Sequence, residues 1–179
     1  MGIIDFFKGG LPSTRKKVMD EEMNSYLDVA KTNLRSGFEF MGNFLDGLKG
    51  FEPAHRHYEM YNTDVKAKLI NIRKEIRNGI IFIEEKLKNT VNTMNTIKSL
   101  DQLRDMINNW ILALESEDSG ILKTLNKDMW GPEMERRMFP IPKNKILVCG
   151  YLITSINYLK RAKESLDNYN ELNNIPEAA

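Results

Sequence analysis

The sequence predicts an all-α fold, a bundle of four main helices with short helices and a short N-terminal amphipathic segment. Apolar residues recur every three or four positions over long stretches, which is the spacing of one helix face. Strand signals are nearly absent, because no run alternates apolar and polar residues and the Asn78-Gly79 pair lies inside a helical stripe. Long helices joined by short links bury their apolar faces most simply as an antiparallel bundle.

The first ten residues form a separate apolar segment. On a two-turn helix its large side chains cluster on one side, and Gly9 and Gly10, followed by Pro12, interrupt any continuation. Each of these side chains gains about 1.5–3 kcal/mol from burial. The bundle of the same chain, a partner protein and a neighbouring copy are open as docking sites, whereas a membrane surface is disfavoured because Lys8 alone attracts lipid weakly. The segment supplies four partner-binding candidates: Ile3, Ile4, Phe6 and Phe7.

The first main helix is expected to begin at residues 13–14 or at Asp20, since each position suits an N-cap. Apolar residues keep helical spacing over residues 19–48, and Gly50 suits a stop. Gly37 is a candidate kink.

The clearest element is one very long helix, about residues 64–98. Its apolar positions advance by four, three and four residues, which is an eleven-residue repeat close to the natural helix period. The repeat runs through Val65, Leu69, Ile72, Ile76, Ile80, Ile83, Leu87, Val91 and Met94. A nearly straight rod of about 50 Å is expected, in which Gly79 marks either a close helix contact or a weak point. Ile70, Ile81 and Phe82 widen the apolar stripe and indicate burial on two sides.

Ser99 and Gln102 fit a capping box at the start of the third main helix. That helix is expected to end near residues 116–120, and a short helix is expected at 121–129. The stretch that follows contains Pro140 and Pro142 and is typical of a loop. The last main helix is expected from about residue 144 to residue 173.

Length and composition bound the domain plan and the setting. The chain of 179 residues suits one domain, so the plan is an N-terminal docking segment (1–10), a single helical-bundle domain (11–175) and a frayed tail (176–179). A net charge of +1 favours neither nucleic acid nor anionic lipid as a partner. Cys149 has no cysteine to pair with, and no signal peptide or membrane-spanning stretch is visible. The predicted location is therefore the cytoplasm, or a virus particle assembled there.

The two histidines give the most specific metal-like pattern. Residues 52–55 spell the Glu-x-x-His unit of di-iron bundles, and His57 and Glu59 follow closely. Such sites need two of these units and two further glutamates. Surface or capping histidines are the preferred interpretation, and a metal or catalytic role for Glu52, His55, His57 and Glu59 is the alternative. No catalytic residue, cofactor or small-molecule substrate is predicted.

Charged clusters and the cysteine are weaker signals. Acidic runs such as residues 115–118 would bind Mg²⁺ only if they converged, so solvated helix faces are preferred. Arg73, Lys74 and Arg77 form the best basic patch, but the near-neutral total disfavours nucleic-acid binding. Cys149 lies on the apolar stripe of the last helix, where a buried structural thiol is expected.

Aromatic residues gather within residues 38–61, and Trp130 and Phe139 lie in the proline-containing loop. Packing in the core and loops is the simpler interpretation, and an exposed contact surface is the alternative, with Trp130 and Phe139 as partner-binding candidates.

Together these features favour a non-enzymatic protein–protein interaction or assembly (structural) protein that binds a partner or itself. A phage virion component fits the composition, which is rich in Asn, Lys and Ile. The alternatives are a small helical regulator or inhibitor of one target protein and, with less support, a small helical metal protein or enzyme that uses the His55/His57 region.

Overall fold

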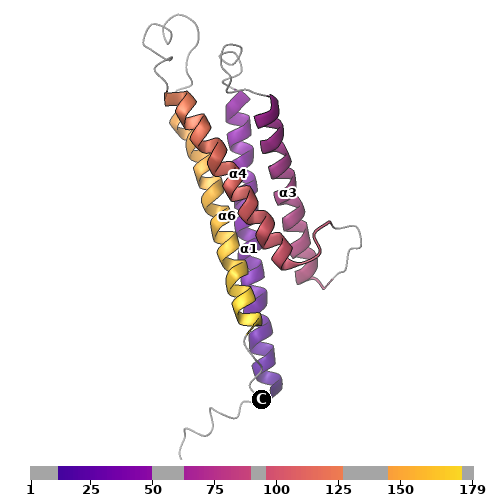
Figure 1. Cartoon of the computed structure of the whole chain (residues 1–179). Coiled ribbons are helices and arrows are strands. Elements are labelled where there is room, and N and C mark those ends of the chain that lie inside the picture. The colour runs from indigo at the N-terminus through magenta and orange to yellow at the C-terminus, as the bar shows by residue number, and fades with distance from the viewer. Residues whose placement is uncertain (1–11, 50–62, 90–95, 127–144, 175–179) are drawn as a thin grey trace, which may run out of the picture.

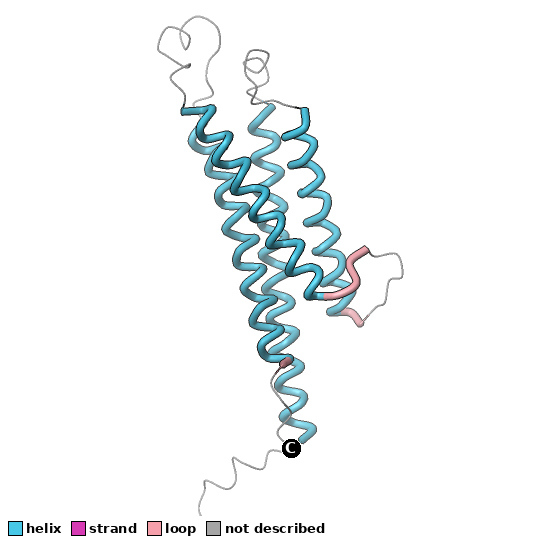
Figure 2. Tube along the Cα trace, in the orientation of Figure 1, coloured by secondary structure: helices cyan, strands magenta, loops and turns pink. Residues whose placement is uncertain are grey.

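The computed structural model describes residues 12–49, 63–89, 96–126 and 145–174, and these residues contain four helices and no strand. The helices are α1 (Pro12–Lys49), α3 (Thr63–Leu87), α4 (Leu100–Asn126) and α6 (Lys145–Asn173). Successive helices run in opposite directions, and α4 crosses obliquely in front of the others (Figure 1). The described segments are helical apart from short turns and loops (Figure 2). The all-α prediction is confirmed for this part of the chain, in which no helix is long and apolar enough to cross a membrane.

The helices α1 and α6 form the main pair. In each, buried positions advance alternately by three and four residues, which is the seven-residue spacing of a coiled-coil seam. Small residues let the two backbones approach, because a Cβ added at Gly37 would lie 3.1 Å from Leu159 Cδ2 and one added at Gly47 would lie 2.7 Å from Val148 Cγ2. The seam of α1 is Leu27, Ala30, Leu34, Gly37, Met41, Phe44 and Leu48, and that of α6 is Val148, Leu152, Ser155, Leu159, Ala162 and Leu166.

The large apolar residues of α6 are mostly buried, and Ile153 is an exception. Ile153 is 44% exposed, whereas Ser155 is fully buried. The hydroxyl of Ser155 donates a hydrogen bond of 2.7 Å to the backbone carbonyl of Gly37. Burial of this polar group is therefore compensated, and the bond ties α6 to the middle of α1.

The helix α1 is the longest of the four and continues through Gly37 without interruption. It begins at Pro12, just before the expected caps. Proline suits the first turn of a helix because the N–H that it lacks would have no partner there. In Figure 1 the first turns of α1 project beyond the end of α6.

The predicted helix over about residues 64–98 is too long. α3 ends at Leu87, and residues 97–99 are not helical. Asn89 adopts a φ of 53°, a left-handed conformation that asparagine tolerates better than most residues. Lys88 N–H donates to the carbonyl of Glu84 and Asn89 N–H to that of Lys86, each at 3.1 Å. These bonds close the last turn, so Asn89 terminates a helix whose apolar repeat would have allowed it to continue.

The break predicted within residues 116–129 is also wrong in the described part. α4 continues as one helix from Leu100 to Asn126, so residues 121–126 do not begin a separate short helix. No proline interrupts this stretch, and a single internal glycine costs a helix only about 1 kcal/mol.

The helix α3 packs on α1, and α4 joins α3 to α6. The close-contact interpretation of Gly79 is confirmed, because a Cβ there would lie 2.9 Å from Leu103 Cδ1 on α4. Beside it the indole N–H of Trp110, a side chain only 3% exposed, donates to Glu75 Oε2 at 2.6 Å. This bond satisfies a buried donor and fixes the register between α3 and α4.

Candidate functional site

The predicted site residues lie outside the described residues. This holds for the partner-binding candidates Ile3, Ile4, Phe6, Phe7, Trp130 and Phe139 and for the metal candidates Glu52, His55, His57 and Glu59. Their roles stay predictions from the sequence. Within the described residues, the candidates for a functional site are the charged clusters and the exposed apolar residues of the helices.

The acidic run at residues 115–118 diverges rather than converging on a metal. Glu115 pairs with Lys160 of α6 at 2.5 Å, and Glu117 pairs with Lys68 of α3 at 2.8 Å. Desolvation, with a smaller contribution from nearby Glu115, raises the pKa of Asp118 above its usual value. Within the described residues no group of three or more His, Cys, Asp or Glu side chains could hold a metal ion. The run therefore joins α4 to both of its neighbours.

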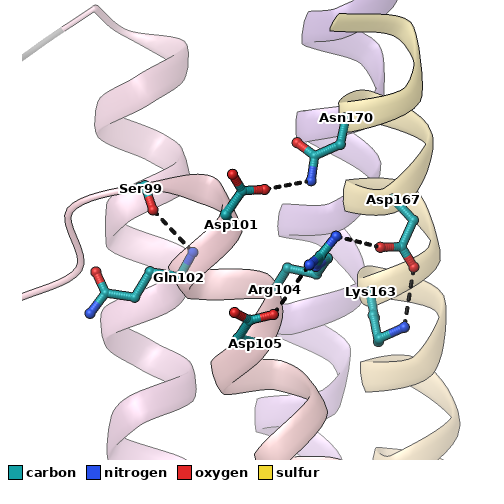
Figure 3. A network of polar contacts seen from close by, with 8 residues as sticks. All are labelled: Ser99, Asp101, Gln102, Arg104, Asp105, Lys163, Asp167 and Asn170. Carbon is teal, nitrogen blue, oxygen red and sulfur yellow. Dashed lines mark hydrogen bonds and ion pairs between the residues drawn. The ribbon is translucent and has the colours of Figure 1, made fainter. Parts of the chain in front are cut away.

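A second polar cluster joins the start of α4 to the end of α6 (Figure 3). Arg104 pairs with Asp167 at 3.6 Å and with Asp105 at 3.3 Å, and Lys163 also reaches Asp167, at 3.2 Å. Asn170 donates to Asp101 at 2.9 Å. These contacts join α4 to α6 and hold the start of α4 in place.

The described aromatic residues of the 38–61 group pack onto the bundle. Phe44 is fully buried in the seam. Phe40 stacks on Tyr158, with ring centroids 5.7 Å apart, and also contacts Tyr151 at 6.1 Å. Phe38 lies under the guanidinium of Arg73, 4.0 Å from the ring centroid. For these three phenylalanines the packing interpretation is the one that the contacts support.

The basic patch predicted at Arg73, Lys74 and Arg77 is divided by the fold. Arg73 turns toward α1, where its Nε donates to the carbonyl of Phe38 at 3.1 Å and its guanidinium covers Gly42. Lys74 and Arg77 remain exposed on α3. Because the Arg73 side chain is held against α1, only two of the three cations face solvent.

The exposed side of α3 carries a row of four residues, Ile70, Lys74, Arg77 and Ile81, called here the α3 outer face. They follow one another by four, three and four positions, so they share one stripe about 16 Å long. Ile70 is 51% exposed and Ile81 is 37% exposed. The sequence indicated burial on two sides through Ile70, Ile81 and Phe82, and only Phe82 is buried. The second apolar edge of α3 has no cover among the described residues.

The sequence places the residues of the α3 outer face on one side of a helix, but it does not show whether that side is exposed. Ile70 and Ile81 stand one eleven-residue repeat apart, beside the main stripe. That spacing places them on one face of a helix, but it does not tell whether another helix of the same chain covers that face.

Comparison with known proteins adds no relative: no family model, no curated protein and no solved structure matches this chain.

Proposed function

We propose that this chain is a non-enzymatic protein–protein interaction or assembly protein and that it works in the cytoplasm or in a particle assembled there. The observation that carries the proposal is the α3 outer face. A single exposed isoleucine is common on protein surfaces, but here two lie on one stripe with two cations between them. Apolar side chains grouped with polar ones on an exposed surface are typical of contact sites.

The rest of the bundle suits a stiff support for such a contact. α1 and α6 share a continuous seam, and their buried serine is hydrogen-bonded. Ion pairs between Arg35 and Glu84 and between Lys68 and Glu117 tie α3 to α1 and to α4. A face carried on a helix that is held on two sides needs little ordering when a partner binds.

Site-specific photo-crosslinking tests the proposal. A benzophenone amino acid is placed at Ile70 or at Ile81 in the full chain, which is then expressed in the cells that normally make it. The matched control carries the same group at Asn157, an exposed position on α6. We expect an adduct of one discrete mass from positions 70 and 81, identified by mass spectrometry, and none from position 157.

Equal labelling at all three positions, or no adduct at 70 and 81, would contradict an interaction at this face. Light scattering on the same protein separates the two forms of the proposal. A small regulator of one target is expected to be a monomer or dimer, whereas an assembly protein forms larger closed or open arrays.

A further inference from the structure

We infer that the α3 outer face binds an acidic amphipathic helix of a different protein, one whose carboxylates lie between two aliphatic side chains. The inference rests on the proposed function and specifies the class of partner. Its basis is the order of side chains along the stripe, which is Ile70, Lys74, Arg77 and then Ile81.

The charge on this face is unused. Some cations elsewhere on the bundle have acidic partners, as in the pairs Arg35–Glu84, Lys68–Glu117 and Lys160–Glu115. Lys74 and Arg77 have no such partner among the described residues, and each is exposed. A partner that brings carboxylates to this place gains complementary contacts without breaking an existing pair.

A second copy of the same face is a poor occupant. In an antiparallel pairing of two α3 helices, Ile70 would meet Ile81 of the other copy, but Lys74 would meet Arg77. In a parallel pairing each cation would meet its own equivalent. Like charges brought together in an interface oppose association. Both arrangements are therefore disfavoured by charge, although the isoleucines would match.

The face also suits a protein helix better than a phosphate backbone or a lipid surface. Phosphate binding is favoured by several cations on one surface, and here Arg73 is turned away toward Phe38. The two remaining cations are bracketed by isoleucines, which a duplex backbone does not contact. A helix with aliphatic residues eleven positions apart and acids at the fourth and seventh positions between them matches the row residue by residue.

A synthetic peptide tests the inference. The probe is a helical peptide with leucines eleven positions apart and glutamates at the fourth and seventh positions between them; a second peptide carries lysines in place of the glutamates. Each is titrated into the isotope-labelled full chain, and amide chemical shifts are followed. We expect the acidic peptide to shift amides of α3 and not those on the exposed side of α6. The Lys74→Glu/Arg77→Glu variant should lose about tenfold or more in affinity for the acidic peptide and gain affinity for the lysine peptide.

The matched control is Lys16→Glu/Lys17→Glu at the exposed start of α1, which changes the net charge by the same amount. It should bind the acidic peptide as the wild type does. Far-UV circular dichroism checks that both variants keep their melting temperature, as expected for changes at exposed positions.

Three results would overturn the inference: no shift in α3 with the acidic peptide, an equal loss of affinity in both charge variants, and binding of a DNA duplex or anionic vesicles through Lys74 and Arg77 in place of the peptide. Any of these combined with discrete crosslinks from positions 70 and 81 would leave the proposed function standing and remove only the acidic-helix partner. Absence of crosslinks from positions 70 and 81 would contradict the proposed function and, with it, the inference that rests on it, even if the peptide binds.

Discussion

Glycines in this bundle differ in what surrounds them, although the sequence presents them alike. Gly47 faces Val148, with two methyl carbons 2.7 and 3.0 Å from the position of an added Cβ. Gly150 has no atom within 4 Å of that position. Valine is branched at Cβ, and both of its methyl groups face Gly47, so any turn of the side chain leaves at least one methyl group there. Gly47 therefore sets the distance between α1 and α6, whereas Gly150 does not.

The two glycines should respond in opposite directions to alanine. Gly47→Ala is expected to destabilise the protein by about 1–3 kcal/mol, because overpacking outweighs the gain in helix propensity. Gly150→Ala, the matched control on α6, should stabilise by up to about 1 kcal/mol. Urea unfolding followed by circular dichroism measures both. Equal effects of the two substitutions would show that Val148 does not limit the approach of the helices.

At the scale of single elements, the start of α4 shows how local chemistry fixes a boundary. The Ser99 hydroxyl accepts a hydrogen bond from Gln102 N–H at 3.0 Å, as a capping box requires. The Gln102 side chain accepts from Lys98 N–H at 2.8 Å, one residue before the expected N–H of Ser99. The predicted hydrogen bond from Gln102 N–H to the Ser99 hydroxyl is therefore confirmed. The bond to the Gln102 side chain comes from the N–H of Lys98 and not from that of Ser99.

Removal of this cap should cost measurable stability. Ser99→Ala is expected to lower the free energy of unfolding by about 0.5–2 kcal/mol, because the N–H of Gln102 at the helix start loses its side-chain acceptor. The control is Thr96→Ala, an exposed position just before the helix, which should change stability by less than about 0.5 kcal/mol. Denaturant unfolding distinguishes the two, and a Ser99→Ala variant as stable as the control would show that the cap is dispensable.

At the scale of the whole molecule, four apolar stripes must be divided among neighbours. α1 and α6 bury theirs against each other through a seven-residue seam, and α3 packs on α1. α4 crosses over and is held by Trp110 and Glu75 on one side and by Arg104 and Asp167 on the other. In this arrangement the main apolar stripe of α3 is buried, and the α3 outer face stays exposed.

A whole-molecule prediction concerns the first ten residues. α1 begins at Pro12, so a chain that starts at Leu11 keeps every described helix. If Ile3, Ile4, Phe6 and Phe7 dock on a partner or a neighbouring copy, we expect this version to retain its melting temperature and to lose any self-association of the full chain. Light scattering over a concentration series, with thermal unfolding, measures both properties. A melting temperature several degrees lower would instead show that the segment packs on its own bundle.

The sequence by itself determined the class of fold and the faces of its helices. Helical spacing predicted the core positions of α3 up to Leu87 and the cap at Ser99, because both depend on residues only a few positions apart. It did not determine the end of α3, since the apolar repeat continues past Asn89, whose left-handed backbone stops the helix. Nor did it determine that α4 continues as one helix through residues 116–126, because the local effects that favour and oppose a break there are small.

Only the tertiary structure decided which surfaces remain open. Arg73 and Lys74 are adjacent in sequence, yet one covers Phe38 and the other faces outward. Ile70 and Phe82 both widened the predicted stripe, yet Phe82 is buried and Ile70 is half exposed. Periodicity sets the direction in which a side chain points from its own helix, while burial depends on which helix from a distant part of the chain lies there. For this reason the exposure of the α3 outer face depends on where α1, α4 and α6 lie.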